Sequence, residues 1–122
     1  MFKKLLLATL IGMSFPTSSY ANEINDLTTK AEAGDFFSQI SLGFKYEIGE
    51  EVEKDPVKAV YWYQKAAEQG DATAQFNLAL KYYDGQGVRQ DKRLAKELFG
   101  QSCDNGYQRG CNNYRKLNEQ GY

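Results

Sequence analysis

Apolar and small side chains recur in two stretches of this 122-residue chain at the intervals of a helical face. In each stretch they stand at a first position and then four, five and eight residues further on. The positions are Ser38, Leu42, Gly43 and Tyr46 in one stretch and Ala74, Leu78, Ala79 and Tyr82 in the other. Such intervals bring side chains onto one stripe of an α-helix. The pattern predicts helices that begin at Phe36 and Ala72, directly after an aspartate, and end at Gly49 and Gly85.

A second helix is expected after each of these helices, because another apolar stripe follows a short polar loop. Each loop holds one apolar residue, Val52 or Val88, which we expect to close the end of a helical hairpin. Asp55 is predicted to cap the helix after the first loop, with Pro56 at its first position, and Asp91 to cap the matching helix. The buried face of the first of these helices is expected at Ala59, Trp62, Tyr63, Ala66 and Ala67.

Both helix pairs belong to a repeat of 36 residues. Glycine recurs at Gly34, Gly70 and Gly106 and, in an independent series, at Gly49, Gly85 and Gly121. The same register matches Asp35 with Asp71, Gln39 with Gln75, Lys45 with Lys81 and Asp55 with Asp91. We expect Gly70 and Gly106 to end the second helices in a left-handed turn. A fixed period of this size is typical of a solenoid of helical hairpins, so the predicted fold class is all-α.

The repeat divides the chain into two full hairpins between two single helices. The hairpins are expected at residues 35–70 and 71–106. Residues 22–34 are expected to form an N-terminal capping helix, because their apolar positions match the second half of a unit. Residues 107–122 are expected to form a closing helix with a polar outer face.

The first residues have the features of a secretory signal peptide. Lysines at positions 3 and 4 precede an apolar run over residues 5–15, and small residues follow at Ser19 and Ala21. We predict cleavage after Ala21, which would release residues 22–122 into the periplasm or the medium of a bacterium without membrane insertion. The apolar run is shorter than the about 20 residues that a membrane span needs. The alternative interpretation of this run is a buried core segment.

Charge is nearly balanced in total and uneven in distribution. Residues 22–122 contain 13 basic side chains, the chain's 15 less Lys3 and Lys4, and 16 acidic ones, so their net charge is near −3. Binding of nucleic acid requires a basic face, and a net charge near −3 gives no reason to expect one. Acidic residues gather within the segment 47–55. Such a run is either a solvated face or a contact for a basic partner.

Cys103 and Cys111 are the only cysteines of the chain. They flank the turn before the closing helix, and in an antiparallel pair of helices this separation places them opposite each other. We predict a disulfide, in keeping with an oxidising compartment. Zinc would need more ligands than two cysteines in a chain without histidine provide, and a redox pair would normally be a Cys-x-x-Cys motif. We therefore expect no metal site and no cofactor.

Few catalytic arrangements are compatible with the composition. The absence of histidine excludes Ser-His-Asp and Cys-His sites, and residues 22–122 hold no Ser-x-x-Lys motif. A carboxylate pair among Glu47, Glu50, Glu51 and Glu53 is the arrangement that stays open. We therefore predict that the protein is not an enzyme.

Two stretches of the sequence resemble the Sel-one-like repeat, a relative of the tetratricopeptide repeat. They are AVYWYQKAAEQGDATAQFNL at 59–78 and YYDGQGVRQD at 82–91, and the resemblance extends over residues 31–120. The sequence departs from the family pattern at Glu51, where a second loop glycine is usual, at Ala79, where a packing glycine is usual, and at Gly100.

This resemblance implies a right-handed α–α superhelix like that of tetratricopeptide proteins. It also implies a scaffold that holds a protein or peptide partner on the concave surface formed by the first helices. A weaker implication is β-lactam binding or hydrolysis, because some cysteine-rich relatives are described in that way.

Positions whose residues differ between equivalent units are not constrained by the packing between helices, and we take them as candidates for the partner surface. Three rows of this kind are Phe37, Thr73 and Arg109; Ser41, Asn77 and Asn113; and Phe44, Leu80 and Lys116. The alternative for Phe37 and Phe44 is burial against the N-terminal helix. The predicted function is a protein-interaction module, and a second hypothesis is an immunity protein that neutralises a secreted toxin.

Overall fold

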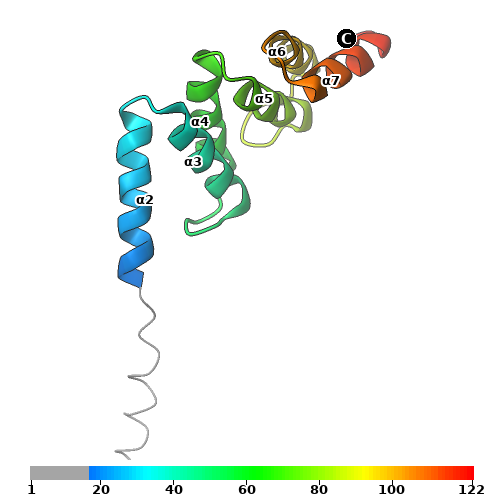
Figure 1. Ribbon diagram of the computed structural model, residues 1–122. Coiled ribbons are helices and arrows are strands. Elements are labelled where there is room, and N and C mark those ends of the chain that lie inside the picture. Colours follow the sequence, from blue (N-terminus) through cyan, green and yellow to red (C-terminus); the bar gives the residue numbers. More distant parts are fainter. Residues whose placement is uncertain (1–16) are drawn as a thin grey trace, which may run out of the picture.

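The computed structural model describes residues 17–122, and this part of the chain forms six helices and no strand (Figure 1). The helices are α2 (Thr17–Glu32), α3 (Phe36–Ile48), α4 (Pro56–Glu68), α5 (Ala72–Asp84), α6 (Lys92–Asp104) and α7 (Gln108–Glu119). The predicted all-α superhelix of helical hairpins is confirmed. Most of the predicted signal peptide, residues 1–16, lies outside the described residues, and residues 17–21 belong to α2.

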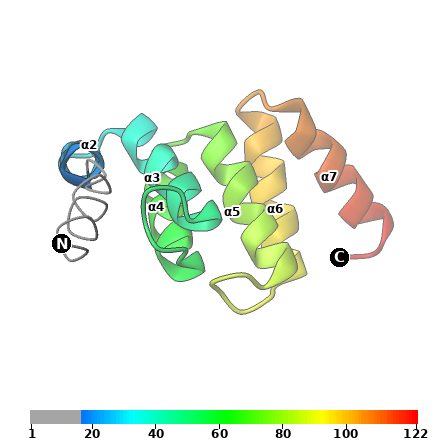
Figure 2. The ribbon, with the colours of Figure 1, turned by 90° about the horizontal axis from the view of Figure 1, so that it is seen from below.

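The helices pack against one another in chain order. The pairs α3 with α4 and α5 with α6 form the two hairpins, α4 packs on α5, and the end helices α2 and α7 pack on α3 and α6. Figure 2 shows the helices following one another along the array, with α2 at one end and α7 at the other. The first helices of the units, α3, α5 and α7, therefore recur along the length of the molecule.

Aspartate side chains determine where four of the helices begin. Asp35 and Asp71 accept hydrogen bonds from the backbone N–H groups three residues further on, at 3.0 and 2.8 Å. Asp55 and Asp91 cap α4 and α6 in the same way. These bonds satisfy amide groups that a helix start leaves without an intrahelical partner. The start of α7 differs, because Tyr107 stands at the cap position and makes no side-chain bond to the helix.

Backbone in the left-handed region ends the first helices and shapes the loops that follow. Gly49 and Gly85 have φ values of 76° and 70°. In the second loop Gly87 has φ 73°, and a Cβ at this position would lie 2.2 Å from the carbonyl oxygen of Pro56. The loop can therefore pack against the start of α4 only with glycine here. Glu51 holds the equivalent place in the first loop with φ 61°, where a side chain is disfavoured by about 1–2 kcal/mol.

Large side chains of the second helices fill the core over small residues of the first helices. Tyr63 of α4 is fully buried, and a Cβ on Gly43 of α3 would come within 2.6 Å of its ring. The equivalent pair in the next hairpin is Phe99 and Ala79, both buried. Most positions of the predicted stripes are buried: Ser38, Leu42, Gly43, Ala59, Trp62, Tyr63, Ala66, Ala67, Ala74, Leu78 and Ala79. Tyr46 and Tyr82, which end the stripes of the first helices, are half-buried and pack against the core. Val88 packs against this core, as expected for a residue that closes the hairpin end. Val52, at the matching place in the first loop, is half-buried and is not among the residues that pack against either core cluster.

Candidate partner-binding surface

The nine residues predicted for the partner surface lie on α3, α5 and α7, and all of them are at least partly exposed. Phe37, Ser41, Phe44, Thr73, Arg109 and Lys116 are exposed, and Asn77, Leu80 and Asn113 are half-buried. The alternative that Phe37 and Phe44 are buried against the N-terminal helix is wrong, because their exposed fractions are 68% and 50%.

An apolar stripe runs along α3 on the side that faces solvent. Phe37 begins it and stacks on the ring of Phe36, with the ring centroids 4.3 Å apart. Phe44 and Ile48 continue it seven and eleven residues later, and Ile48 is 50% exposed. Ile48 was not among the residues predicted from the sequence. Its signal was present, because the equivalent residue one unit later is the acidic Asp84.

A charged network fills the junction between the first hairpin and the second. Glu47 of α3 accepts a hydrogen bond from the Tyr63 hydroxyl at 2.6 Å. Its other carboxylate oxygen forms an ion pair with Lys81 of α5, a residue that is only 4% exposed. Burial is the main cause that raises the pKa of Tyr63 above its ordinary value, and the hydrogen bond to Glu47 is the second cause. The network therefore ties α3, α4 and α5 together through side chains distant in the sequence.

The acidic loop after α3 is partly neutralised by one lysine. Lys45 Nζ lies 3.0 Å from Glu51 Oε2 and 3.7 Å from Glu50 Oε2. The hydrogen bond that Lys45 donates to Glu51 raises the pKa of Lys45 above its usual range. Three of the four carboxylates considered for acid–base chemistry, those of Glu47, Glu50 and Glu51, thus face cations or a phenol.

The junction between the second hairpin and the closing helix is apolar and leaves a small cavity. The cavity has a volume of about 100 Å³ and is lined by Leu80, Tyr83, Phe99, Asn113, Lys116 and Leu117. Three of these residues lie 36 residues after the three members of the charged network. Tyr83 stands in the place of Glu47, Phe99 in the place of Tyr63 and Leu117 in the place of Lys81. Three of the nine predicted surface residues, Leu80, Asn113 and Lys116, therefore border one hollow.

The closing helix carries cations that have no acidic partner within the described chain. Among residues 17–122, no carboxylate lies within salt-bridge distance of Arg109, Arg115 or Lys116. The guanidinium of Arg109 lies over the ring of Phe76, 4.8 Å from its centroid, and donates to the Tyr107 hydroxyl at 3.3 Å. The side chain of Arg109 is thus held in place while its charge stays open to solvent.

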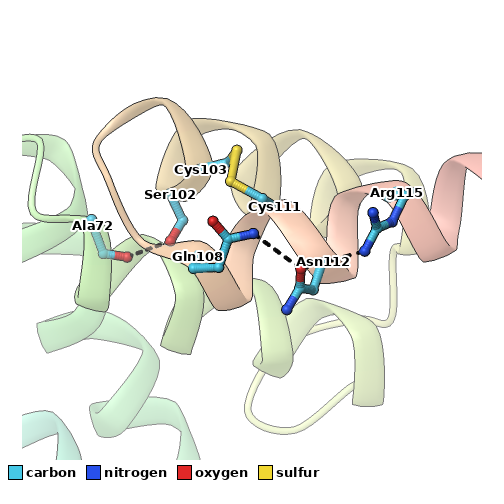
Figure 3. The surroundings of a disulfide bond; sticks show 7 residues. All are labelled: Ala72, Ser102, Cys103, Gln108, Cys111, Asn112 and Arg115. Carbon is cyan, nitrogen blue, oxygen red and sulfur yellow. Dashed lines mark hydrogen bonds between the residues drawn. A yellow bond between two sulfur atoms is a disulfide. The ribbon is translucent and has the colours of Figure 1, made fainter.

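A disulfide between Cys103 and Cys111 joins α6 to α7, as predicted (Figure 3). The two Cα atoms are 4.5 Å apart. Next to it the hydroxyl of Ser102, which is fully buried, donates to the carbonyl oxygen of Ala72 at 2.7 Å. The start of the closing helix is therefore fixed to α6 by a covalent bond, and α6 is fixed to the start of α5 by a hydrogen bond.

The disulfide stands where the earlier units have a buried hydrogen bond. Gln39 donates from Nε2 to the carbonyl oxygen of Ala31 at 3.0 Å, and Gln75 donates to that of Ala67 at 3.3 Å. Counting 36 residues onward from Gln75 and Ala67 gives Cys111 and Cys103. The last unit thus uses a covalent bond for a contact that the other two make through a glutamine side chain.

Two further properties of the described residues concern metal-binding groups and helices that could span a membrane. Residues 17–122 contain no group of three or more histidine, cysteine, aspartate and glutamate side chains placed to hold a metal ion. None of the helices described has the length and apolar character required to cross a membrane.

Comparison with known proteins gives matches over most of the described chain. A family model described as Sel1 repeat matches residues 37–71 and 72–107, more than half of the sequence. The crystal structure of a Sel1 repeat protein from Oxalobacter formigenes is similar with a TM-score of 0.72 and 33% sequence identity, covering 74% of this chain and 68% of that one. Cysteine-rich protein B of Helicobacter pylori is similar with a TM-score of 0.70 and 30% identity, covering 73% of this chain and 67% of that one.

One curated relative is much longer than this chain. It is the secretory immunoglobulin A-binding protein EsiB of Escherichia coli O6:H1, which is 36% identical over 70 residues. The match covers 54% of this chain and 14% of EsiB.

Proposed function

The chain belongs to the Sel1 repeat family, and on this premise we propose that it binds a protein or peptide partner on the surface formed by α3, α5 and α7. The family suggests a protein-protein interaction module, and Sel1 repeat proteins are generally not enzymes. The name of the relative EsiB says that it binds secretory immunoglobulin A, so one related array has a protein as its partner.

The exposed apolar stripe of α3 carries this proposal. Phe37 and Phe44 are large apolar side chains at least half exposed to solvent, and they lie on one side of the helix with Ile48. Exposed apolar side chains that gather on one face can form an interaction site, whereas single scattered ones are normal on protein surfaces. Aromatic side chains of this kind also supply much of the binding energy where they become buried in an interface.

Export from the cytoplasm is part of the proposal. The disulfide between Cys103 and Cys111 is of a type that persists in oxidising compartments. It agrees with the signal peptide predicted over residues 1–21. An exported Sel1 repeat protein would meet its partner in the periplasm or outside the cell.

Site-specific photocrosslinking in the exporting bacterium tests the proposal. A photoreactive amino acid at Ser41 or Thr73, both exposed on first helices, should crosslink to a partner that mass spectrometry can identify. The same amino acid at Gln64 or Gln101, exposed on α4 and α6, is the matched control and should not.

Binding of the purified partner then gives the decisive measurement. The double variant Ser41→Arg and Thr73→Arg should lose binding, because two long charged side chains would block the surface. The control variant Gln64→Arg and Gln101→Arg should keep it. Equal binding by both variants would place the interface elsewhere and refute the proposal.

A further inference from the structure

Two of the three predicted rows on the first helices change in chemistry from one end of the array to the other, while the row of Ser41, Asn77 and Asn113 stays polar. The row that begins with Phe37 continues with Thr73 and Arg109. The row that begins with Phe44 continues with Leu80 and Lys116. Along these two rows the surface is therefore apolar on α3, mixed on α5 and cationic on α7.

From this gradient we infer that the partner segment is both apolar and acidic. It presents a branched aliphatic side chain to the cavity between α5 and α7, and carboxylates beside that side chain to the cations of α7. This inference rests on the proposed function, because it names the chemistry of the partner that the same surface binds.

The cavity has the size and lining for an aliphatic side chain. Its volume is about 100 Å³, somewhat less than the about 150 Å³ of an apolar cavity that accepts benzene. Leu80, Tyr83, Phe99 and Leu117 provide its apolar walls. At the first junction the corresponding positions hold the ion pair of Glu47 and Lys81, and the cavity found there is lined by these charged side chains. The apolar lining is therefore a property of the cavity at the second junction.

The rim of this cavity supplies the charge. Lys116 lines the cavity and is exposed, and Arg109 lies seven residues earlier on the same side of α7. Neither has a carboxylate within salt-bridge distance among residues 17–122. The one acidic residue of α7, Glu119, is the last residue of the helix. A carboxylate next to the inserted aliphatic group would meet cations that nothing in the described chain neutralises.

The acidic loop gives a weaker basis for partner recognition. Glu47 is held by Tyr63 and Lys81, and Glu50 and Glu51 share Lys45. A new ion pair between a basic partner and any of these three carboxylates would compete with the existing contacts. Among the four glutamates of the segment, only Glu53 is exposed and has no salt bridge within the described residues. Charge complementarity therefore favours an acidic segment on α7 over a basic segment on the loop.

Selection from a library of random linear peptides tests this chemistry on the purified, disulfide-bonded protein. Peptides enriched on the wild type should carry leucine, isoleucine or valine next to aspartate or glutamate. Peptides enriched on the Lys116→Glu variant should carry lysine or arginine in place of the acid. The matched control is Arg93→Glu, which reverses an exposed charge on α6 and should leave the enriched sequences unchanged.

A charge exchange with one synthetic peptide makes the test quantitative. For an enriched acidic peptide, Lys116→Glu should weaken binding about 5- to 30-fold, since an exposed ion pair is lost and a repulsion of similar size replaces it. Replacing the acid of the peptide by lysine should restore most of that loss on the variant and not on the wild type.

The outcomes separate this inference from the proposed function. Enriched peptides that are neutral or basic, or an acidic motif that stays the same on Lys116→Glu, would overturn the inference while leaving a peptide-binding surface in place. Enrichment that is equal on the wild type and on the Ser41→Arg and Thr73→Arg variant would place binding elsewhere and overturn both. A lack of any enrichment on the wild type would count against both as well.

Discussion

Replacing the disulfide by the glutamine contact of the earlier units provides a direct test of the repeat. The change is Cys103→Ala with Cys111→Gln, which restores the residue types of Ala67 and Gln75 at the matching positions. The reference variant is Cys103→Ala with Cys111→Ala, which has neither a covalent bond nor a hydrogen bond between α6 and α7 at this point.

The expected magnitudes follow from the size of the closed loop and the value of one hydrogen bond. With a sequence separation of 8, the chain-entropy relation gives a disulfide contribution of about 2.5 kcal/mol. A buried hydrogen bond such as that from Gln75 to the carbonyl of Ala67 contributes about 1 kcal/mol net. The alanine variant should therefore lose about 2.5 kcal/mol, and the glutamine variant should recover about 1 kcal/mol of this.

Thermal unfolding followed by circular dichroism measures the difference. For a domain of about 100 residues, 1 kcal/mol corresponds to about 4–8 °C in Tm, so the alanine variant should melt about 10–20 °C below the oxidised wild type. The glutamine variant should melt about 4–8 °C above the alanine variant. Equal melting of the two variants would refute the claim that the disulfide replaces the glutamine contact.

Three further predictions use the same repeat geometry. Ala67→Cys with Gln75→Cys should form a second disulfide, because these positions match the existing pair; mass spectrometry under non-reducing conditions should find no free thiol. Gly87→Ala should lower the free energy of unfolding, measured with urea, by more than about 2 kcal/mol, and Gly106→Ala should lower it by about 1–2 kcal/mol. Both glycines have positive φ, but only at position 87 would a Cβ press into a backbone carbonyl of α4. Equal losses in the two variants would contradict this. Burial raises the pKa of Tyr63, so above about pH 10 the unfolded chain releases a proton that the folded protein keeps, and stability falls by about 1.4 kcal/mol per pH unit. Tyr63→Phe should remove this part of the decline and leave the pH dependence between about pH 7 and pH 10, where no carboxylate titrates, unchanged in urea titrations.

The helix boundaries could be predicted from the sequence because they depend on local chemistry. An aspartate that accepts from the first turn acts within three residues, and a glycine with positive φ acts at its own position. The 36-residue register then transferred each assignment from one unit to the next. The start of α2 at Thr17, upstream of the predicted cleavage point, was not foreseen.

The features that distinguish the two junctions could not be predicted in this way. The hydrogen bond from Tyr63 to Glu47 joins residues 16 apart, and the ion pair of Glu47 with Lys81 joins residues 34 apart. Neither contact can be predicted by comparing residues 36 positions apart, because the two partners do not occupy matching positions. Lys45 and Lys81 match in the register, and each donates to the loop that follows its own helix, Lys45 to Glu51 and Lys81 to Gln86. Lys81 in addition pairs with Glu47 of the preceding hairpin. Identity at equivalent positions predicts backbone placement, whereas side-chain partners depend on which residues differ nearby.

The covalent link to α7 and the cations on α7 are connected by the physics of an end helix. A last helix can pack on one side only, and α7 has just two buried residues, Gly110 and Leu117, with no side-chain cap at its start. Few apolar contacts hold a helix weakly. The bond of Cys103 to Cys111 compensates for this, because it fixes the start of α7 without requiring more buried side chains. The remaining positions of the helix are then free to be polar, and Lys116 stands among them at the rim of the apolar cavity. Reduction of the disulfide should accordingly weaken a partner held at this cavity more than one held on the stripe of α3.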